Sequence, residues 1–409
     1  MINRDEQTAG PVVCSAKASK LKNLRYGIVA IAHRADHVIG RRFSRPRVIV
    51  EARTPMNLAV LAPLWRALID DPRLDVRFTH PDRADIAQAI AASKLQSRVA
   101  PRSRAAFQRW DLYMNADPWD PAVLWRCRRR INFFHGVAGK YDLECPTGLP
   151  LDLGRYDRIA FPNAGRMQRY VAAALVSPEQ AALVGFPKLD ALVNSRGPAR
   201  VRAAALGLDD TVPTAIYAPT FSPQSSLQQH GEEIVRSLLE KGLNVIVKLH
   251  DRSLDPDPAY SGGMDWRARF AAFAGTGRCL FASDGDSTEY LLASDVMVTD
   301  HSTIGFEFCA LDRPLLVFDV PDLLIAARVD ARKAHLLRSA ADVVSTAAQL
   351  GPAVDRALRE PGERAAQRRE AVNDVFYDPG RATERALGLC YGLIEGTPVP
   401  AARPTVAAW

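Results

Sequence analysis

The chain has 409 residues, of which 47% are hydrophobic and 24% are charged, a balance that is typical of a folded globular protein and excludes a disordered one. The length predicts two domains, because a single hydrophobic core of this size is unusual. The formal net charge is +7, yet no helix-turn-helix, zinc-finger or aromatic RNA-binding pattern accompanies the basic residues, so we expect no nucleic acid partner.

Neither a membrane span nor a secretory signal is predicted. The clearest apolar runs, residues 26–32 and 243–249, fall short of the roughly 20 residues that a bilayer requires. Residues 1–10 contain acidic side chains and no apolar core followed by a cleavage site. We therefore expect the protein in the cytoplasm.

The cysteines predict free thiols in a reducing compartment. No pair has C-x-x-C spacing, and none combines with histidine in the spacing of a zinc site, so we expect neither a disulfide framework nor a bound metal. The six cysteines are Cys14, Cys127, Cys145, Cys279, Cys309 and Cys390.

Basic and apolar residues are interleaved in an N-terminal segment, residues 1–45. Lys20 and Lys22, for example, alternate with Leu21 and Leu24. A segment of this kind can lie on an anionic membrane surface, which would make the protein peripheral on the inner face of the plasma membrane. A solvated arm is an equally good interpretation.

From residue 46 onward, short β-branched runs alternate with longer runs of helical period, which predicts parallel, doubly wound sheets. A basic cluster, residues 126–130, directly precedes one predicted strand. In the N-terminal domain, residues 46–195, strands are expected at residues 47–52, 74–80, 130–136 and 156–163, and helices at residues 57–70, 82–93 and 164–176.

A turn-rich, charged stretch, residues 194–213, is expected to link the two domains. The C-terminal domain, residues 196–378, is expected to have strands at residues 214–220, 244–250, 295–300 and 314–319, and helices at residues 232–242, 288–294 and from about residue 302. A last helix, residues 382–396, and a loose tail make up residues 379–409. The expected fold class is α/β, with two Rossmann-like domains that face each other across a cleft.

Polar residues follow several predicted strands, where ligands bind in open α/β sheets. His135 ends one strand and precedes Gly136, and two interpretations are open: a core histidine with a backbone partner, or a catalytic base at the mouth of the sheet. The other polar positions at strand ends are residues 217–220, Lys248, His250 and residues 299–303.

Residues 299–303 are expected to form a tight turn into a helix. Ser302 and Thr303 at the helix start would favour an anion, because unpaired N–H groups and the positive dipole end point there. Ordinary capping by Asp300 or Ser302 explains the same pattern.

Lys248 and His250 alternate on a predicted strand, so both side chains are expected on one face. Burying them together without an anion would be costly, which favours an anionic ligand between the domains. His250 could instead be an exposed residue at the strand end. Pro219 and Thr220 could shape a nucleotide pocket or only a turn.

Six short motifs occur in the same order as in the bacterial CDP-glycerol glycerophosphotransferases, which build or prime teichoic acids, and in relatives that build capsule polymers. The resemblance covers roughly residues 130–320. The motifs are FFHG (133–136), GFPKLDAL (185–192), YAPTF (217–221), VIVKLH (245–250), SDVMVTDHST (294–303) and RPLLVFD (313–319).

The resemblance implies a GT-B fold, no metal or other cofactor, and transfer of an alditol phosphate from a CDP-activated donor to an acceptor hydroxyl. CDP-glycerol or a related CDP-alditol would be the donor, and a lipid-linked or polymeric molecule the acceptor. By position, His135 and His250 would be catalytic: His135 would be the base, and His250 would bind the donor phosphates and stabilise charge. Ser302 and Thr303 would hold the pyrophosphate, Lys248 and Asp300 would also bind the donor, Pro219 and Thr220 would lie near the nucleotide, and Gly136, Gly185, Pro187 and Asp190 would order the domain junction.

Three positions depart from the family pattern. Asp251 replaces a proline, His301 a tyrosine and Lys188 an arginine. At residue 188, lysine cannot make the bidentate contacts that an arginine guanidinium group makes with a phosphate. Two alternatives therefore stay open: a GT-B glycosyltransferase or epimerase that uses a UDP-sugar, and a non-catalytic GT-B-like module at the membrane surface.

Overall fold

The computed structural model describes residues 36–37, 39–40, 42–117, 124, 126–134, 136–144, 153–195, 197–255, 257–282 and 285–397. The chain divides into two compact units, Met1–Pro46 and Arg47–Trp409. In the first unit the described residues 36–37, 39–40 and 42–43 are helical, while most of the predicted basic segment lies outside the described residues. The described helices are all too short or too polar to cross a membrane.

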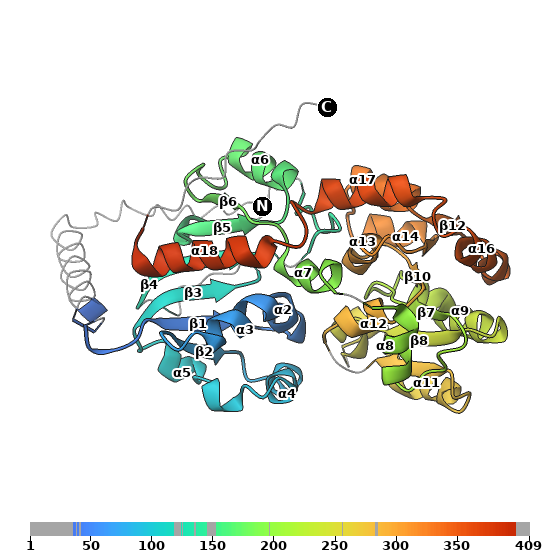
Figure 1. Ribbon diagram of the computed structural model, residues 1–409, viewed down its shortest axis with the longest axis horizontal. Coiled ribbons are helices and arrows are strands. Elements are labelled where there is room, and N and C mark those ends of the chain that lie inside the picture. Colours follow the sequence, from blue (N-terminus) through green and yellow to red (C-terminus); the bar gives the residue numbers. More distant parts are fainter. Residues whose placement is uncertain are drawn as a thin grey trace, which may run out of the picture. The chain divides into compact units, whose positions relative to one another are not determined.

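The second unit contains two sheets of six parallel strands each (Figure 1). We call residues 47–195 the first half and residues 197–378 the second half. The first sheet has the order β2-β1-β3-β4-β5-β6, with β1 (Arg47–Glu51), β2 (Asp75–Thr79), β3 (Trp110–Asn115), β4 (Cys127–Phe133), β5 (Arg158–Phe161) and β6 (Ala181–Leu183). The second has the order β12-β11-β10-β7-β8-β9, with β7 (Thr214–Tyr217), β8 (Asn244–Lys248), β9 (Cys279–Ala282), β10 (Val296–Thr299), β11 (Leu315–Phe318) and β12 (Asp342–Val344).

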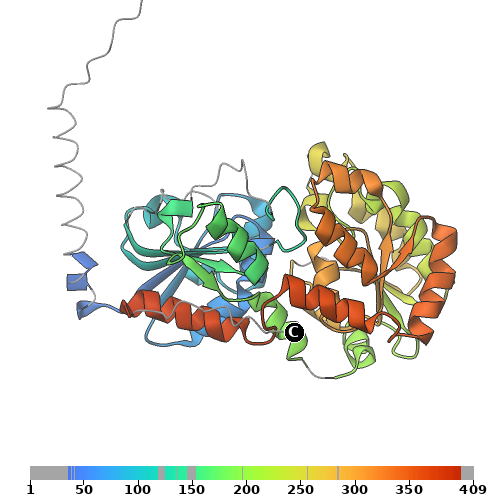
Figure 2. The ribbon, with the colours of Figure 1, turned by 90° about the horizontal axis from the view of Figure 1, so that it is seen from above.

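Helices flank both sheets (Figures 1 and 2). Those of the first half are α2 (Pro55–Val60), α3 (Ala62–Asp70), α4 (Ala84–Ala92), α5 (Arg102–Ala105), α6 (Ala164–Ala172) and α7 (Pro187–Val193). Those of the second half are α8 (Ala199–Ala205), α9 (Ser226–Glu240), α10 (Pro258–Ser261), α11 (Trp266–Ala274), α12 (Thr288–Leu292), α13 (Thr303–Cys309), α14 (Pro321–Ala326), α15 (Ala331–Ser339), α16 (Ala347–Arg359) and α17 (Ala365–Val375). The last helix is α18 (Ala382–Glu395).

Helices cover both faces of each sheet, so most strand residues are buried. Every residue of β3, β7, β8, β10 and β11 is buried, as expected for parallel strands without a solvent-facing side. One hydrophobic cluster contains side chains of both sheets, among them Val48 and Ile216. The two doubly wound sheets predicted from the alternating pattern are therefore present.

Three predicted elements need correction. The basic cluster at residues 126–130 does not precede a strand, because β4 begins at Cys127. The single helix expected at residues 57–70 is two helices that meet at Leu61, since Pro63 has no N–H for a continuous helix. The strand expected to run to His250 ends at Lys248.

The last helix returns to the first half, where α18 packs against α3, α7, β3 and β4. Figure 2 shows α18 alongside the first sheet. Arg128 of β4 donates from Nη1 to the carbonyl of Ile394 at 2.9 Å. The C-terminal helix thus belongs to the packing of a sheet built from residues more than 180 positions earlier in the chain.

Asp190 holds the start of α18. Its carboxylate accepts from the backbone N–H groups of Gly380 at 2.9 Å, Ala382 at 3.2 Å and Thr383 at 2.6 Å. The N–H groups of a first helical turn have no partner within the helix, and the dipole there favours a negative charge. One carboxylate from α7 therefore both caps α18 and joins it to the first half.

Gly185 and Pro187 shape the turn into α7. Gly185 has a φ of 91°, and a Cβ there would lie 2.5 Å from the carbonyl oxygen of Tyr377, so only glycine fits. Pro187 is the first residue of α7, where its missing N–H costs nothing.

Candidate functional site

A cavity of about 700 Å³ lies at the carboxyl ends of strands from both sheets. His135 lies outside the described residues, directly before Gly136 in the chain. Asp300, Gly185, Pro187 and Asp190 are not part of the cavity wall. Seven sequence-predicted residues line it: Gly136, Pro219, Thr220, Lys248, His250, Ser302 and Thr303.

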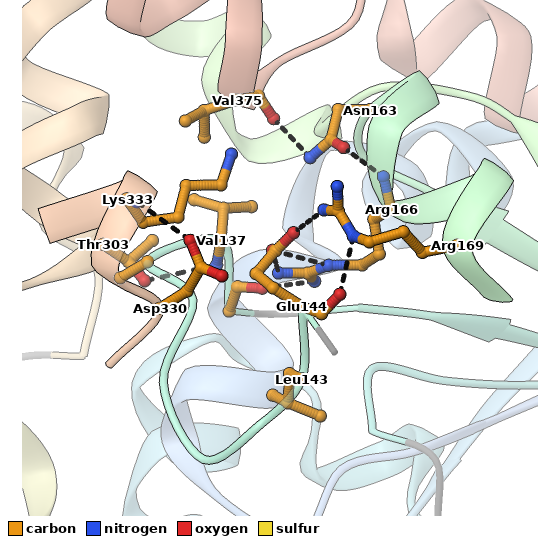
Figure 3. Close-up of polar contacts among 12 residues, drawn as sticks. Val137, Leu143, Glu144, Asn163, Arg166, Arg169, Thr303, Asp330, Lys333 and Val375 are labelled. Carbon is orange, nitrogen blue, oxygen red and sulfur yellow. Dashed lines mark hydrogen bonds and ion pairs between the residues drawn. The ribbon is translucent and has the colours of Figure 1, made fainter. Parts of the chain in front are cut away.

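The segment Gly136–Glu144, which we call the bridging loop, belongs to the first half of the chain but makes hydrogen bonds to the second half. It follows β4 of the first half, yet much of its backbone pairs with the second half. The backbone contacts are Val137 N–H to Thr303 Oγ1 at 3.3 Å (Figure 3), Tyr141 N–H to the Ala327 carbonyl at 2.8 Å, and Asp330 N–H to the Gly139 carbonyl at 2.8 Å.

Two arginines of α6 hold the bridging loop to the first half (Figure 3). Glu144 pairs with both Arg166 and Arg169, and Arg166 also donates from Nη1 to the carbonyl of Gly136 at 2.6 Å. Glu144 and Arg166 are almost wholly buried. Burial raises the pKa of Glu144, but the arginines and Lys333 outweigh it and bring that pKa below its ordinary value. The carboxylate therefore stays charged and paired.

Gly139 packs the bridging loop closely against α15. Its φ is 71°, and a Cβ there would lie 2.7 Å from Cγ of Lys333, so a larger residue would be strained. Gly136 differs, since an added Cβ would meet no described atom within 4 Å. Packing within the described structure does not explain the glycine at residue 136.

His301 joins the two halves through its side chain. Its Nε2 lies 2.8 Å from the carbonyl oxygen of Ala138, and because a carbonyl can only accept, Nε2 carries the proton. Burial, together with the charge of Lys140, lowers the pKa of His301 to about 4. The imidazole is therefore neutral at physiological pH and donates to the bridging loop.

Asp300 organises the loop after β7. Its carboxylate accepts from the N–H of Thr220 at 2.8 Å and from the N–H and Oγ of Ser226 at 3.2 and 3.0 Å. Thr220 in turn donates from Oγ1 to the carbonyl of His301 at 2.6 Å and accepts from Nζ of Lys140 at 2.7 Å. Asp300 thus positions Thr220 and does not line the cavity itself.

Ser302 and Thr303 present hydroxyl groups at the cavity wall. Ser302 occupies the N-cap position of α13, but its side chain makes no capping hydrogen bond to the described residues. Ordinary capping therefore does not account for its hydroxyl group. Thr303 Oγ1 accepts from the bridging loop, which leaves its O–H to donate elsewhere.

His250 lies beyond the end of β8, at the start of the 3₁₀ turn η4 (Asp251–Leu254). Its Nδ1 accepts from the N–H of Arg252 at 3.1 Å, so the neutral ring carries its proton on Nε2. The ring also contacts that of Phe221, with centroids 4.5 Å apart. Lys248 Nζ donates to the Leu249 carbonyl at 3.0 Å.

The three departures from the family pattern have distinct surroundings. Lys188 forms a buried ion pair with Glu307 at 2.7 Å and donates to Ser287 at 3.0 Å. Asp251 lines the cavity with one buried carboxylate oxygen that lacks a hydrogen-bond partner among the described residues, and burial raises the pKa of this carboxyl. His301 donates to the carbonyl of Ala138 across the halves.

The cavity combines hydroxyl donors, histidine and lysine at the ends of parallel strands. This set can bind and orient a phosphorylated ligand and can accept a proton. In the part of the chain that the structure describes, no group of three or more His, Cys, Asp or Glu side chains is arranged to hold a metal ion. The described Cys127, Cys279, Cys309 and Cys390 form no disulfide.

Comparison with protein families supplies a match over residues 147–390, to the family described as CDP-Glycerol:Poly(glycerophosphate) glycerophosphotransferase. This chain belongs to that family. None of the curated protein sequences matches it.

Solved structures of teichoic acid and nucleotide-sugar enzymes share the fold of this glycerophosphotransferase family member. The wall teichoic acid polymerase TagF has a TM-score of 0.65 at 14% identity, over 90% of this chain and 97% of that chain. A putative UDP-N-acetylglucosamine 2-epimerase from Listeria monocytogenes has a TM-score of 0.56 at 15% identity, over 87% and 99%. The structure of S. aureus MnaA with UDP has a TM-score of 0.54 at 13% identity, over 86% of this chain and 97% of that chain. The expected GT-B fold is confirmed.

Several residues that build the site were not predicted from the sequence. Lys140 could have been found, because it is a basic residue only a few positions after the predicted His-Gly pair. The pair of Arg166 and Glu144 could not, because these residues are 22 positions apart and meet only in the folded chain. Family membership alone did not indicate this arrangement.

The buried His301 predicts an acid-sensitive contribution to stability. Between its ordinary pKa of 6.5 and about 4, the unfolded chain binds a proton at this position and the folded chain does not. The free energy of unfolding should therefore fall as the pH is lowered through this window, by up to about 3 kcal/mol.

His301→Gln is the matched control, because glutamine keeps an N–H donor for Ala138 but does not titrate. Urea unfolding of both proteins at several pH values between 7 and 4 isolates the difference. We expect the wild type to lose stability relative to the variant as the pH falls. If the free energy of unfolding changed with pH equally in both proteins, the assignment of a neutral, buried imidazole would be contradicted.

Proposed function

We propose that this glycerophosphotransferase family member transfers glycerol phosphate, or a similar alditol phosphate, from a CDP-activated donor to an acceptor hydroxyl and releases CMP. The observation that carries the proposal is the cavity at the strand ends, lined by His250, Ser302 and Thr303, which lie in motifs that resemble those of the family. A TagF variant has been solved after a soak with CDPG, which makes CDP-glycerol the first donor to test. The product would be a teichoic-acid-like or capsule-like envelope polymer.

Transfer requires one bond to form and one to break at the donor's β-phosphorus. The acceptor oxygen bonds to this phosphorus as the bond to the CMP oxygen breaks, and CMP leaves with the electron pair. We assign the proton of the acceptor hydroxyl to His135, because an imidazole with an ordinary pKa near 6.5 can act as a base at neutral pH.

Positioning and charge neutralisation account for most of the catalysis in phosphoryl transfer. We assign the donor phosphates to the Nε2–H of His250, to Lys248 and to the hydroxyls of Ser302 and Thr303. Pro219 and Thr220 would lie near the nucleotide. Asp300, Asp190, Gly136, Gly185 and Pro187 are proposed to act by positioning these groups and the junction between the halves.

Replacing His135 by alanine should lower the rate of CMP release from CDP-glycerol at least about 100-fold, because the acceptor would lose its base. Binding of CDP-glycerol should change little, since His135 acts on the acceptor. The measurement is CMP release with a crude lipid acceptor fraction, beside calorimetric binding of the donor. His335→Ala, at an exposed position of α15, is the matched control and should release CMP normally.

Each of the other possible results would refute a different part of the proposal. Unchanged CMP release by His135→Ala would remove His135 as the base. Turnover of CDP-ribitol or a UDP-sugar, without turnover of CDP-glycerol, would replace the donor and keep the fold. No turnover with any donor would favour the non-catalytic module.

We propose that the reaction needs no metal ion. Cationic side chains line the cavity, among them Lys140, Lys248 and Arg252, and could offset the donor's negative charge. CMP release should therefore be equal with EDTA and with added Mg²⁺. A loss in EDTA that Mg²⁺ restores would contradict this proposal.

We propose that the acceptor is lipid-linked or polymeric and that residues 1–45 bring the chain to an anionic membrane surface. Basic and apolar residues are interleaved there, and the described Ile39 and Phe43 are 60% and 82% exposed. The full chain should sediment with vesicles of anionic phospholipid and not with neutral ones, and removing residues 1–45 should abolish this binding. Equal sedimentation of both chains would rule out the segment as the anchor.

A further inference from the structure

Lys140 of the bridging loop brings a positive charge from the first half into loops of the second half. Its Nζ donates to Thr220 Oγ1 at 2.7 Å, and its side chain lines the cavity together with Thr220, Ser302 and Thr303. Since Thr220 already donates its own hydroxyl proton to the His301 carbonyl, its oxygen is oriented to accept from the ammonium group.

No described carboxylate lies within ion-pair distance of the Lys140 ammonium group. Lys140 is half-buried, whereas the fully buried Lys188 and Lys333 each pair with a carboxylate, Glu307 and Asp374. An ammonium group has three N–H donors, and Thr220 takes one of them. Two donors of Lys140 thus lack a partner among the described residues.

Asp300, whose negative charge acts on Lys140, already makes hydrogen bonds within the protein. Both carboxylate oxygens of Asp300 accept hydrogen bonds from Thr220 and Ser226. Burial lowers the pKa of Lys140 to about 8, against the opposing charge of Asp300. A partly desolvated cation without its own carboxylate is unfavourable, and an anion in the cavity would remove that cost.

We infer that Lys140 binds a phosphate group of the ligand that occupies this cavity, with Thr220 orienting its ammonium group. The ligand class is a di- or pyrophosphate, and its identification with the donor's pyrophosphate rests on the proposed function. The bridging loop, which begins directly after His135 in the chain, would then also neutralise the donor.

The test compares Lys140→Met with the wild type in calorimetric titrations against inorganic pyrophosphate, CDP-glycerol and cytidine. The variant should bind pyrophosphate and CDP-glycerol at least tenfold more weakly and cytidine equally well, because only the first two carry phosphate. Lys140→Arg should recover part of the affinity, and Lys94→Met, at an exposed lysine, should bind all ligands normally.

Thermal unfolding separates this role from a structural one. Removing a desolvated charge that lacks a carboxylate partner should leave the midpoint unchanged or raise it. A lowered midpoint with equal loss of cytidine binding would show a structural residue and overturn the inference.

The remaining outcomes distinguish the inference from the proposed function. Pyrophosphate binding that depends on Lys140, without any binding of CDP-glycerol, would keep the phosphate site and refute the CDP donor. Wild-type affinity for pyrophosphate in Lys140→Met, or no pyrophosphate binding by the wild type, would overturn the inference.

Discussion

The hydrogen bonds between the bridging loop and the second half determine where the chemistry of this protein can take place. Val137 pairs with Thr303, Ala138 with His301, and Tyr141 with Ala327. A single hydrogen bond contributes only about 1 kcal/mol, but together they hold one loop of the first half against two loops of the second. The position of Lys140 within the loop follows from these contacts.

The opposite side of the loop is held by buried charge. Arg166 reaches the Gly136 carbonyl at one end of the loop and Glu144 at the other. Breaking a buried ion pair by removing one partner leaves an uncompensated charge, which typically costs about 3–5 kcal/mol. The loop is therefore anchored at both ends to α6 and along its middle to the second half, so motion between the halves would act directly on the site.

Sequence periodicity predicted the doubly wound sheets, because burial on both faces leaves a strong apolar signal, but it placed the ends of several strands too late. It missed β3, whose WDLYMN sequence mixes polar and apolar residues although all are buried. It placed His250 on a strand, whereas the ring caps a 3₁₀ turn. Contacts such as that of His301 with Ala138 join residues 163 positions apart, and no local pattern encodes them.

The most direct test of this account is a crystal structure of the His135→Asn variant with CDP-glycerol, in which slow turnover preserves the donor. We predict that the donor phosphates lie among Lys140, Lys248, His250, Ser302 and Thr303, while the bridging loop keeps its hydrogen bonds to the second half. Phosphates bound elsewhere, or a bridging loop detached from His301 and Thr303 in the complex, would contradict it.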